Sequence, residues 1–164
     1  MNANSYEAFI RRLDKSRMST FLVAEYLHKR GYTVHIPAFD YRPLGSNWQD
    51  HVDNGDLYVW KERDDMLRID VKHINRQFTC REDFPHSHIF VADARAIKRA
   101  DPKPSAYIVV NKAATHIAII WWKTSSVWEE HQVFASNTQR HIKVMRCPTE
   151  HVDFRALDVR GLND

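Results

Sequence analysis

The feature that most constrains the fold is a pair of short apolar segments, about residues 56–60 and 66–73, on either side of a charged run. That run is Lys61–Asp65, and it contains no apolar residue. Apolar segments of this length, alternating with polar residues and separated by a polar turn, are typical of a β-hairpin. We therefore expect two neighbouring antiparallel strands in this part of the chain.

The apolar residues also indicate how the two strands pair. A turn centred on Arg63 places Leu57 opposite Ile69 and Val59 opposite Leu67. All four side chains are apolar and fall on one side of the hairpin, as one-sided burial requires. We expect that side to pack against a hydrophobic core.

The same register brings two acidic residues together on the other face. Asp56 lies opposite Asp70, and directly opposed residues have Cβ atoms roughly 5 Å apart. Two negative charges at that separation destabilise a sheet unless something offsets their repulsion. A divalent cation would do so, because hard cations such as Mg²⁺ take oxygen ligands, commonly one or two carboxylates and water.

Lys72 follows Asp70 by two residues, so it points to the same face of the strand. An ammonium group there can neutralise the carboxylates, orient or deprotonate a water molecule, or stabilise a developing oxyanion. The ordinary alternative is a solvated Lys72 paired with Asp70, and an Asp56 that merely starts a strand after a turn. The presence of all three residues on one face favours a site.

The N-terminal segment supplies a third acidic residue. Residues 1–30 have the spacing of an amphipathic helix that ends at Gly31, with a break near residues 14–19 as the alternative. The apolar stripe before Glu25 consists of Met18, Phe21 and Leu22. Glu25 continues this stripe and is expected to face the sheet, where a carboxylate needs a partner. If the helix packs across the face of the two aspartates, Glu25 can reach the metal. The alternative is that Glu25 lies at the edge of the apolar stripe, where its carboxylate reaches water.

Between the helix and the later strands the pattern is less uniform. Residues 33–36 read as a short strand and residues 37–54 as a loop. Farther along, a strand at 89–92 followed by helical turns at 94–100 is one interpretation. One longer helix over 86–100 is the other, and periodicity does not decide between them.

The C-terminal half is rich in strand-like segments. Strands are expected at 106–111 and 116–122, a helix or strand at 127–134, and a last strand at 142–145. The order of elements predicts an α/β (α+β) fold, with the N-terminal helix packed on a mixed central β-sheet. The length suggests that residues 1–164 form a single domain.

Composition limits the cellular setting. The hydrophobic fraction of 43% is sufficient for a core, and no apolar run is long enough to span a bilayer. The two cysteines, Cys80 and Cys147, form no CxxC and fit a reducing cytoplasm. The formal net charge of +3 and pI of about 8.9 permit a polyanionic partner without requiring one. We expect a cytoplasmic protein with no membrane partner.

Taken together, these residues resemble the PD-(D/E)xK nuclease superfamily. Its pattern is a helix carrying a Glu, a first strand, a strand opening with the motif Asp, and a next strand carrying (D/E)-x-K. The matching stretches are Val23–Leu27, Lys29–Val34, Asn54–Val59 and Arg68–Lys72. Gly55 replaces the motif Pro, and the second acid is Asp instead of the more frequent Glu. The resemblance implies a restriction-endonuclease-like core.

The resemblance also implies a role for each site residue. Asp56 and Asp70 would bind Mg²⁺ or Mn²⁺, with the backbone carbonyl of Val71 as a further ligand. Lys72 would position the attacking water, and Glu25 would support the metal site. The implied reaction is hydrolysis of phosphodiester bonds in DNA, with RNA left open. Such nucleases often dimerise to cut both strands, so a homodimer is a further expectation.

Aromatic and basic residues outside this set are candidates for nucleic-acid contact. Tyr41, Arg42 and Trp48 precede Asp56, where they can stack on bases or contact phosphates. Packing of Tyr41 and Trp48 on the core is an equal alternative. Arg76 opens a basic stretch in the middle of the chain, for which a solvated face is the alternative.

Three functions are compatible with these features. The leading interpretation is a DNA-cleaving enzyme, whether an endonuclease, an exonuclease or a junction resolvase. The second is a catalytically inactive nuclease-like domain that binds nucleic acid or a protein partner. The third is a structural protein whose carboxylates meet by chance. The intact set of Asp56, Asp70 and Lys72 favours the first.

Overall fold

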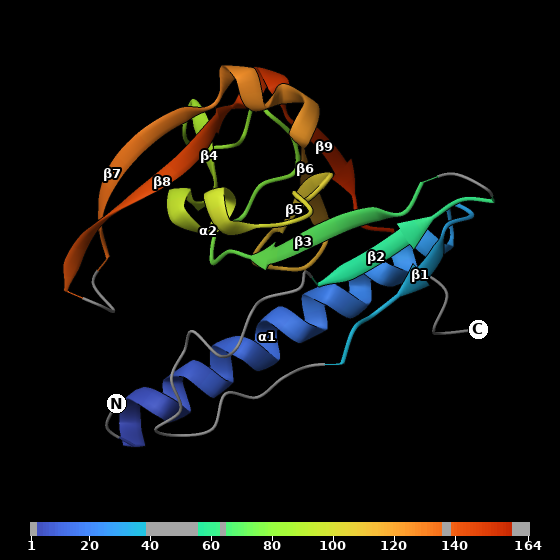
Figure 1. Cartoon of the computed structure of the whole chain (residues 1–164), viewed down its shortest axis with the longest axis horizontal. Coiled ribbons are helices and arrows are strands. Elements are labelled where there is room, and N and C mark those ends of the chain that lie inside the picture. The colour runs from blue at the N-terminus through green and yellow to red at the C-terminus, as the bar shows by residue number, and fades with distance from the viewer. Residues whose placement is uncertain (1–2, 39–55, 63–64, 136–138, 159–164) are drawn as a thin grey trace.

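The computed structural model describes residues 3–38, 56–62, 65–135 and 139–158 (Figure 1). Two helices and nine strands make up the framework of this part of the chain. In chain order they are α1 (Ala3–His28), β1 (Thr33–His35), β2 (Leu57–Trp60), β3 (Leu67–His73), β4 (His88–Asp93), α2 (Ala94–Arg99), β5 (Ala106–Val110), β6 (His116–Trp121), β7 (Glu129–Ala135), β8 (Arg140–Pro148) and β9 (Asp153–Ala156). Two 3₁₀ turns, Trp122–Val127 and Thr149–His151, connect the later strands.

The strands form two sheets. The larger has six strands in the order β1-β2-β3-β5-β6-β9, and the smaller has three in the order β4-β8-β7. Strands β3 and β5 are parallel, whereas the other pairs are antiparallel. The predicted mixed sheet in an α+β fold is therefore confirmed. The crossover from β3 to β5 contains β4 and α2, as a parallel connection requires a long intervening segment.

The hairpin register predicted from the apolar residues is confirmed. Leu57 pairs with Ile69, and Val59 pairs with Leu67, across β2 and β3. These side chains belong to a buried cluster or pack against it. A shift of one residue would move every apolar side chain of a strand to the opposite face, so burial of one face specifies the pairing strongly.

Helix α1 is continuous, so the alternative of a break near residues 14–19 is wrong. Its last residue is His28, and Gly31 closes the helix as predicted, with φ of +85°, a conformation that glycine adopts without a Cβ clash. The Tyr32 N–H donates to the Leu27 carbonyl at 3.2 Å, and the Gly31 N–H donates to the His28 carbonyl at 2.9 Å. These two bonds form a Schellman motif, which satisfies carbonyls at the helix end.

The buried face of α1 differs from the predicted stripe. Met18 is 61% exposed and Phe21 is 50% exposed, so these two residues do not face the sheet. The side chains that do so are Val23, Ala24, Tyr26 and Leu27, and Leu22 of the predicted stripe packs against the same cluster. Apolar residues occur on several sides of this helix, and one position along the sequence turns the face by about 100°. The spacing alone therefore did not identify the packed face.

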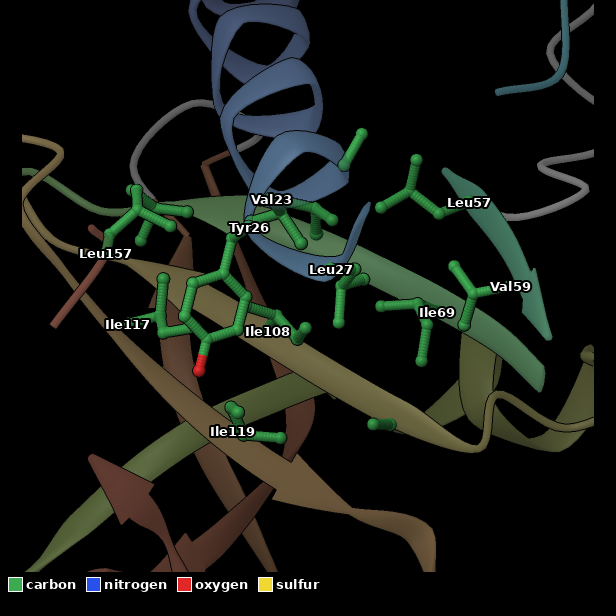
Figure 2. Close-up of a cluster of buried hydrophobic side chains, with 14 residues drawn as sticks. Val23, Tyr26, Leu27, Leu57, Val59, Ile69, Ile108, Ile117, Ile119 and Leu157 are labelled. Carbon is green, nitrogen blue, oxygen red and sulfur yellow. The ribbon is translucent and has the colours of Figure 1, made fainter. Parts of the chain in front are cut away.

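Hydrophobic clusters lie on both faces of the six-stranded sheet. Figure 2 shows the first, in which Val23, Tyr26 and Leu27 of α1 pack over Ile69 and Ile108 of the sheet. The second cluster lies between the opposite face and the smaller sheet, and includes Tyr107, Val109, Ile89, Val91 and Cys147. The order of layers is therefore α1, the six-stranded sheet and the three-stranded sheet (Figure 1).

The structure decides the open alternatives in the rest of the chain. Residues 88–93 form strand β4 and residues 94–99 form α2, so the longer helix over 86–100 is wrong. The Asp93 carboxylate caps α2 by accepting from the N–H of Arg95 at 2.7 Å. Residues 127–134 fall mainly in strand β7 and not in a helix.

The last predicted strand, 142–145, is part of the longer strand β8 and is not the last. Strand β9 follows it and pairs with β6, at the edge of the larger sheet. The loop predicted at residues 37–54 lies almost entirely outside the described residues. No helix in the described part of the chain is long and apolar enough to cross a membrane.

Candidate functional site

Asp56 is positioned by the start of the β2–β3 hairpin. It directly precedes β2, and the Leu57–Ile69 pair places it at the level of Asp70 on β3. Its Oδ2 accepts a hydrogen bond from the Val71 N–H at 2.6 Å. The Asp56 carboxylate therefore lies against the backbone of β3, between Asp70 and Lys72 in the sequence.

The backbone of Val71 adds a further oxygen to this place. In a strand the N–H and C=O of one residue point toward the same neighbouring strand. The Val71 N–H points toward Asp56, so the Val71 carbonyl points toward that side as well. Two carboxylates and a backbone carbonyl are hard oxygen donors of the kind that Mg²⁺ and Mn²⁺ prefer.

Asp70 and Lys72 point to the same face of the sheet. Their register partners on β5 are Tyr107 and Val109, which belong to the cluster facing the smaller sheet. Ile69 and Val71, by contrast, face α1. Side chains thus alternate along β3: the apolar Ile69 and Val71 lie under the helix, and the charged Asp70 and Lys72 lie on the opposite face.

Lys72 is held beside an aromatic ring. Its Nζ lies 5.7 Å from the centroid of the Tyr107 ring. An ammonium within about 6 Å of a ring centroid is attracted by the electron density of the ring face. Tyr107 is fully buried, so it provides a fixed surface that keeps the Lys72 amine on the side of Asp70.

Arg68 is a member of this cluster that the sequence analysis did not identify. Its Nη2 lies 3.6 Å from Asp70 Oδ1, and its Nη1 donates to the Pro102 carbonyl at 3.0 Å. Arg68 precedes Asp70 by two residues, so the period of the strand was the signal that places it there. Its guanidinium offsets part of the repulsion between the two aspartates, in addition to the divalent cation and the Lys72 ammonium expected from the sequence.

The expected role of Glu25 is not supported by the geometry. Helix α1 packs on the face of Ile69 and Val71, whereas Asp70 and Lys72 point to the opposite face. Glu25 instead pairs with Lys29, whose Nζ lies 2.8 Å from Oε1 one helical turn away. The condition under which Glu25 would reach the metal is therefore not met, because α1 covers the face of the sheet opposite Asp70 and Lys72.

The proposed nucleic-acid contacts divide into two groups. Tyr41, Arg42 and Trp48 lie outside the described residues. Arg76 lies three residues beyond the end of β3 and has an exposed side chain. Its backbone carbonyl accepts from the Lys112 N–H at 2.9 Å, which ties this segment to the end of β5.

The donor set available to a metal consists of few protein groups. Within the described ranges, no group of three or more His, Cys, Asp and Glu side chains is arranged to bind a metal. Asp56 and Asp70 supply two carboxylates, and Val71 supplies a carbonyl. Mg²⁺ is commonly bound by one or two carboxylates while it keeps several waters, so this set fits such an ion.

Comparison of the chain with protein-family models, with curated proteins and with solved structures finds no match. The resemblance to PD-(D/E)xK nucleases therefore depends on the motif residues and on the order of the elements that carry them.

Proposed function

We propose that this chain is a metal-dependent nuclease with a restriction-endonuclease-like core, which hydrolyses phosphodiester bonds in DNA. The observation that carries the proposal is the juxtaposition at β2 and β3. The Asp56 carboxylate is bonded to the backbone between Asp70 and Lys72, and the last two share one face. The element order of helix, strand and hairpin, with DxK on the second hairpin strand, also supports it.

In the proposed reaction Asp56, Asp70 and the Val71 carbonyl would hold the ion. When bound, Mg²⁺ or Mn²⁺ supplies a Lewis acid that polarises the phosphate and favours departure of the leaving oxygen. The Lys72 amine, held near Tyr107, orients the water whose oxygen attacks phosphorus. The water oxygen forms a new bond to phosphorus and gives up one proton to solvent. The P–O bond to the leaving oxygen breaks, and that oxygen takes up one proton from solvent. Arg68 holds the Asp70 carboxylate in place from the other side.

Cleavage assays on defined substrates test this proposal. We expect the wild-type protein to cut at least one of duplex, single-stranded or branched DNA with Mg²⁺ or Mn²⁺, and EDTA to stop the reaction. RNA oligonucleotides of the same sequences show whether the enzyme distinguishes ribose from deoxyribose. Failure to cut any of these substrates with either ion, or cutting that persists in EDTA, would exclude a metal-dependent nuclease.

A second function has one observation in its favour. The Arg68 guanidinium beside Asp70 and the Val71 N–H on Asp56 give both carboxylates a protein partner. A domain of this kind can be stable without a metal, and can bind nucleic acid without cutting it. Binding of the same DNA substrates without cleavage in either ion would favour this second function.

A further inference from the structure

A pocket opens beyond the end of β3, between the segment that follows this strand and the smaller sheet. Its volume is about 680 Å³, within the usual range for sites that bind small organic molecules. One wall is formed by residues 74–76, which follow β3, and another by the strands of the smaller sheet. Ile74 packs against the same cluster as Tyr107, so this wall of the pocket continues the face that carries Asp70 and Lys72. The wall on the smaller sheet includes Phe90 and Arg146, which alternate with the buried pair Ile89 and Cys147 and so point away from that cluster.

The pocket also lies close to Lys72 along the chain. Ile74 is the next residue after Lys72 to point to this face, and its N–H donates to the Val110 carbonyl at 3.0 Å, which continues the strand pairing. Two residues of extended chain span at most about 7 Å, and four residues at most about 14 Å. The Cα of Arg76 is therefore within about 14 Å of the Cα of Lys72.

The residues that line the pocket favour an anionic ligand. No lining residue is an aspartate or a glutamate. The lining includes two arginines and three histidines, which are Arg76, Arg146, His86, His88 and His131. Glu129 pairs with two of them: Arg146 Nη2 donates to its Oε2 at 2.6 Å, and His88 Nε2 lies 3.5 Å from the same atom. The hydrogen bonds from Arg146 hold the pKa of Glu129 below its ordinary value.

Arg76 differs from Arg146 in its surroundings. Among the described residues, the structure shows no carboxylate paired with the Arg76 side chain, which is exposed. Its charge is therefore available to a phosphate, whereas the charge of Arg146 is largely offset by Glu129. A guanidinium matches two phosphate oxygens with parallel N–H donors.

The pocket also presents an exposed aromatic ring. Phe90 is 53% exposed, although it is a large apolar side chain on a strand. It lies directly opposite Arg146 in the β4–β8 pairing, so a ring and a guanidinium stand side by side on one wall. Aromatic rings beside basic groups are the means by which proteins bind unpaired nucleotides, since bases stack on the rings while phosphates meet the charges.

We infer that this pocket binds a single-stranded segment of nucleic acid, with a phosphate at Arg76 and a base stacked on Phe90. A single strand is favoured over a duplex because stacking on a side chain needs a base that is free of its neighbours. This inference rests on the proposed function, because the bound strand would run from the pocket toward Asp70 and Lys72.

Binding without metal tests the inference separately from cleavage. Anisotropy of a labelled single-stranded oligonucleotide is measured in EDTA for wild type, Arg76→Ala and Phe90→Ala. Each variant is expected to raise Kd about tenfold. Arg76→Ala should also reduce the slope of log Kd against log salt by about 0.7, whereas Phe90→Ala leaves it unchanged. DNA and RNA oligonucleotides of one sequence, and a matched duplex, form the three arms.

Matched variants outside the pocket serve as controls. Arg155→Ala removes an exposed arginine on β9, and Phe134→Ala removes an exposed aromatic ring on β7. Both should bind as wild type does. No binding by wild type, wild-type affinity in Arg76→Ala and Phe90→Ala, or equal losses in the controls would each overturn the inference. If binding depends on Arg76 and Phe90 but the protein cuts no substrate, the nucleic-acid site is supported and the nuclease function is rejected.

Discussion

Replacing Asp70 with Asn is expected to lower metal-dependent cleavage by about 10³-fold, because metal-ion catalysis supplies several kilocalories per mole and each 1.36 kcal/mol is tenfold. The amide has nearly the same shape but lacks the charge that would hold the proposed ion. It also keeps an oxygen for the neighbouring Arg68 guanidinium, which lies 3.6 Å from Asp70 Oδ1 in the wild type. The measurement is the single-turnover rate at saturating Mg²⁺.

Asp65→Asn is the matched control for this variant. Asp65 is an exposed acid in the connection between β2 and β3, at the opposite end of β3 from Lys72. It should cut at the wild-type rate. Thermal unfolding of both variants separates loss of the ion from loss of the fold. An Asp70→Asn protein that cuts as fast as wild type would show that the reaction takes place elsewhere.

Truncation of Phe78 is expected to have the largest effect on stability. Phe78 is 1% exposed, and its ring lies 5.6 Å from the rings of both Phe84 and Phe154. Removing a buried aromatic ring costs about 3–5 kcal/mol, through lost burial and the cavity left behind. Because a domain has only about 5–15 kcal/mol of stability, Phe78→Ala should lose a large share of it.

Urea titration of Phe78→Ala against wild type measures this loss. Phe90→Ala is the matched control, since it removes the same group from a position that is 53% exposed. Its free energy of unfolding should change by no more than about 0.5 kcal/mol. A Phe78→Ala protein within about 1 kcal/mol of wild type would mean that the cluster around Phe78 is loosely packed.

The hairpin was predictable in detail because two signals agreed there. The charged run between the strands marks the turn, and Leu57 and Ile69 belong to a set that must face one core. Strands β5 and β6 were predictable for a related reason, since a strand buried on both faces reads as an apolar run. Strand β9 was not, because its short, largely exposed sequence resembles a loop.

Residues of the candidate site that lie on one strand could be placed from the sequence. The position of a residue that depends on packing between elements could not. The period of two along β3 places Asp70 and Lys72 on one face, and the same rule would have identified Arg68. The position of Glu25 depends on which stripe of α1 is buried, and apolar residues on several sides left that open. The pocket joins residues from β4, β7 and β8, whose meeting is set by the tertiary fold.

The most direct test of the central claim is anomalous diffraction from crystals soaked in Mn²⁺. If Asp56, Asp70 and the Val71 carbonyl form a metal site, a peak will lie within bonding distance of both carboxylates and will vanish in Asp70→Asn crystals. A peak elsewhere, or none at this place at saturating Mn²⁺, would contradict the claim that these strands hold a catalytic ion.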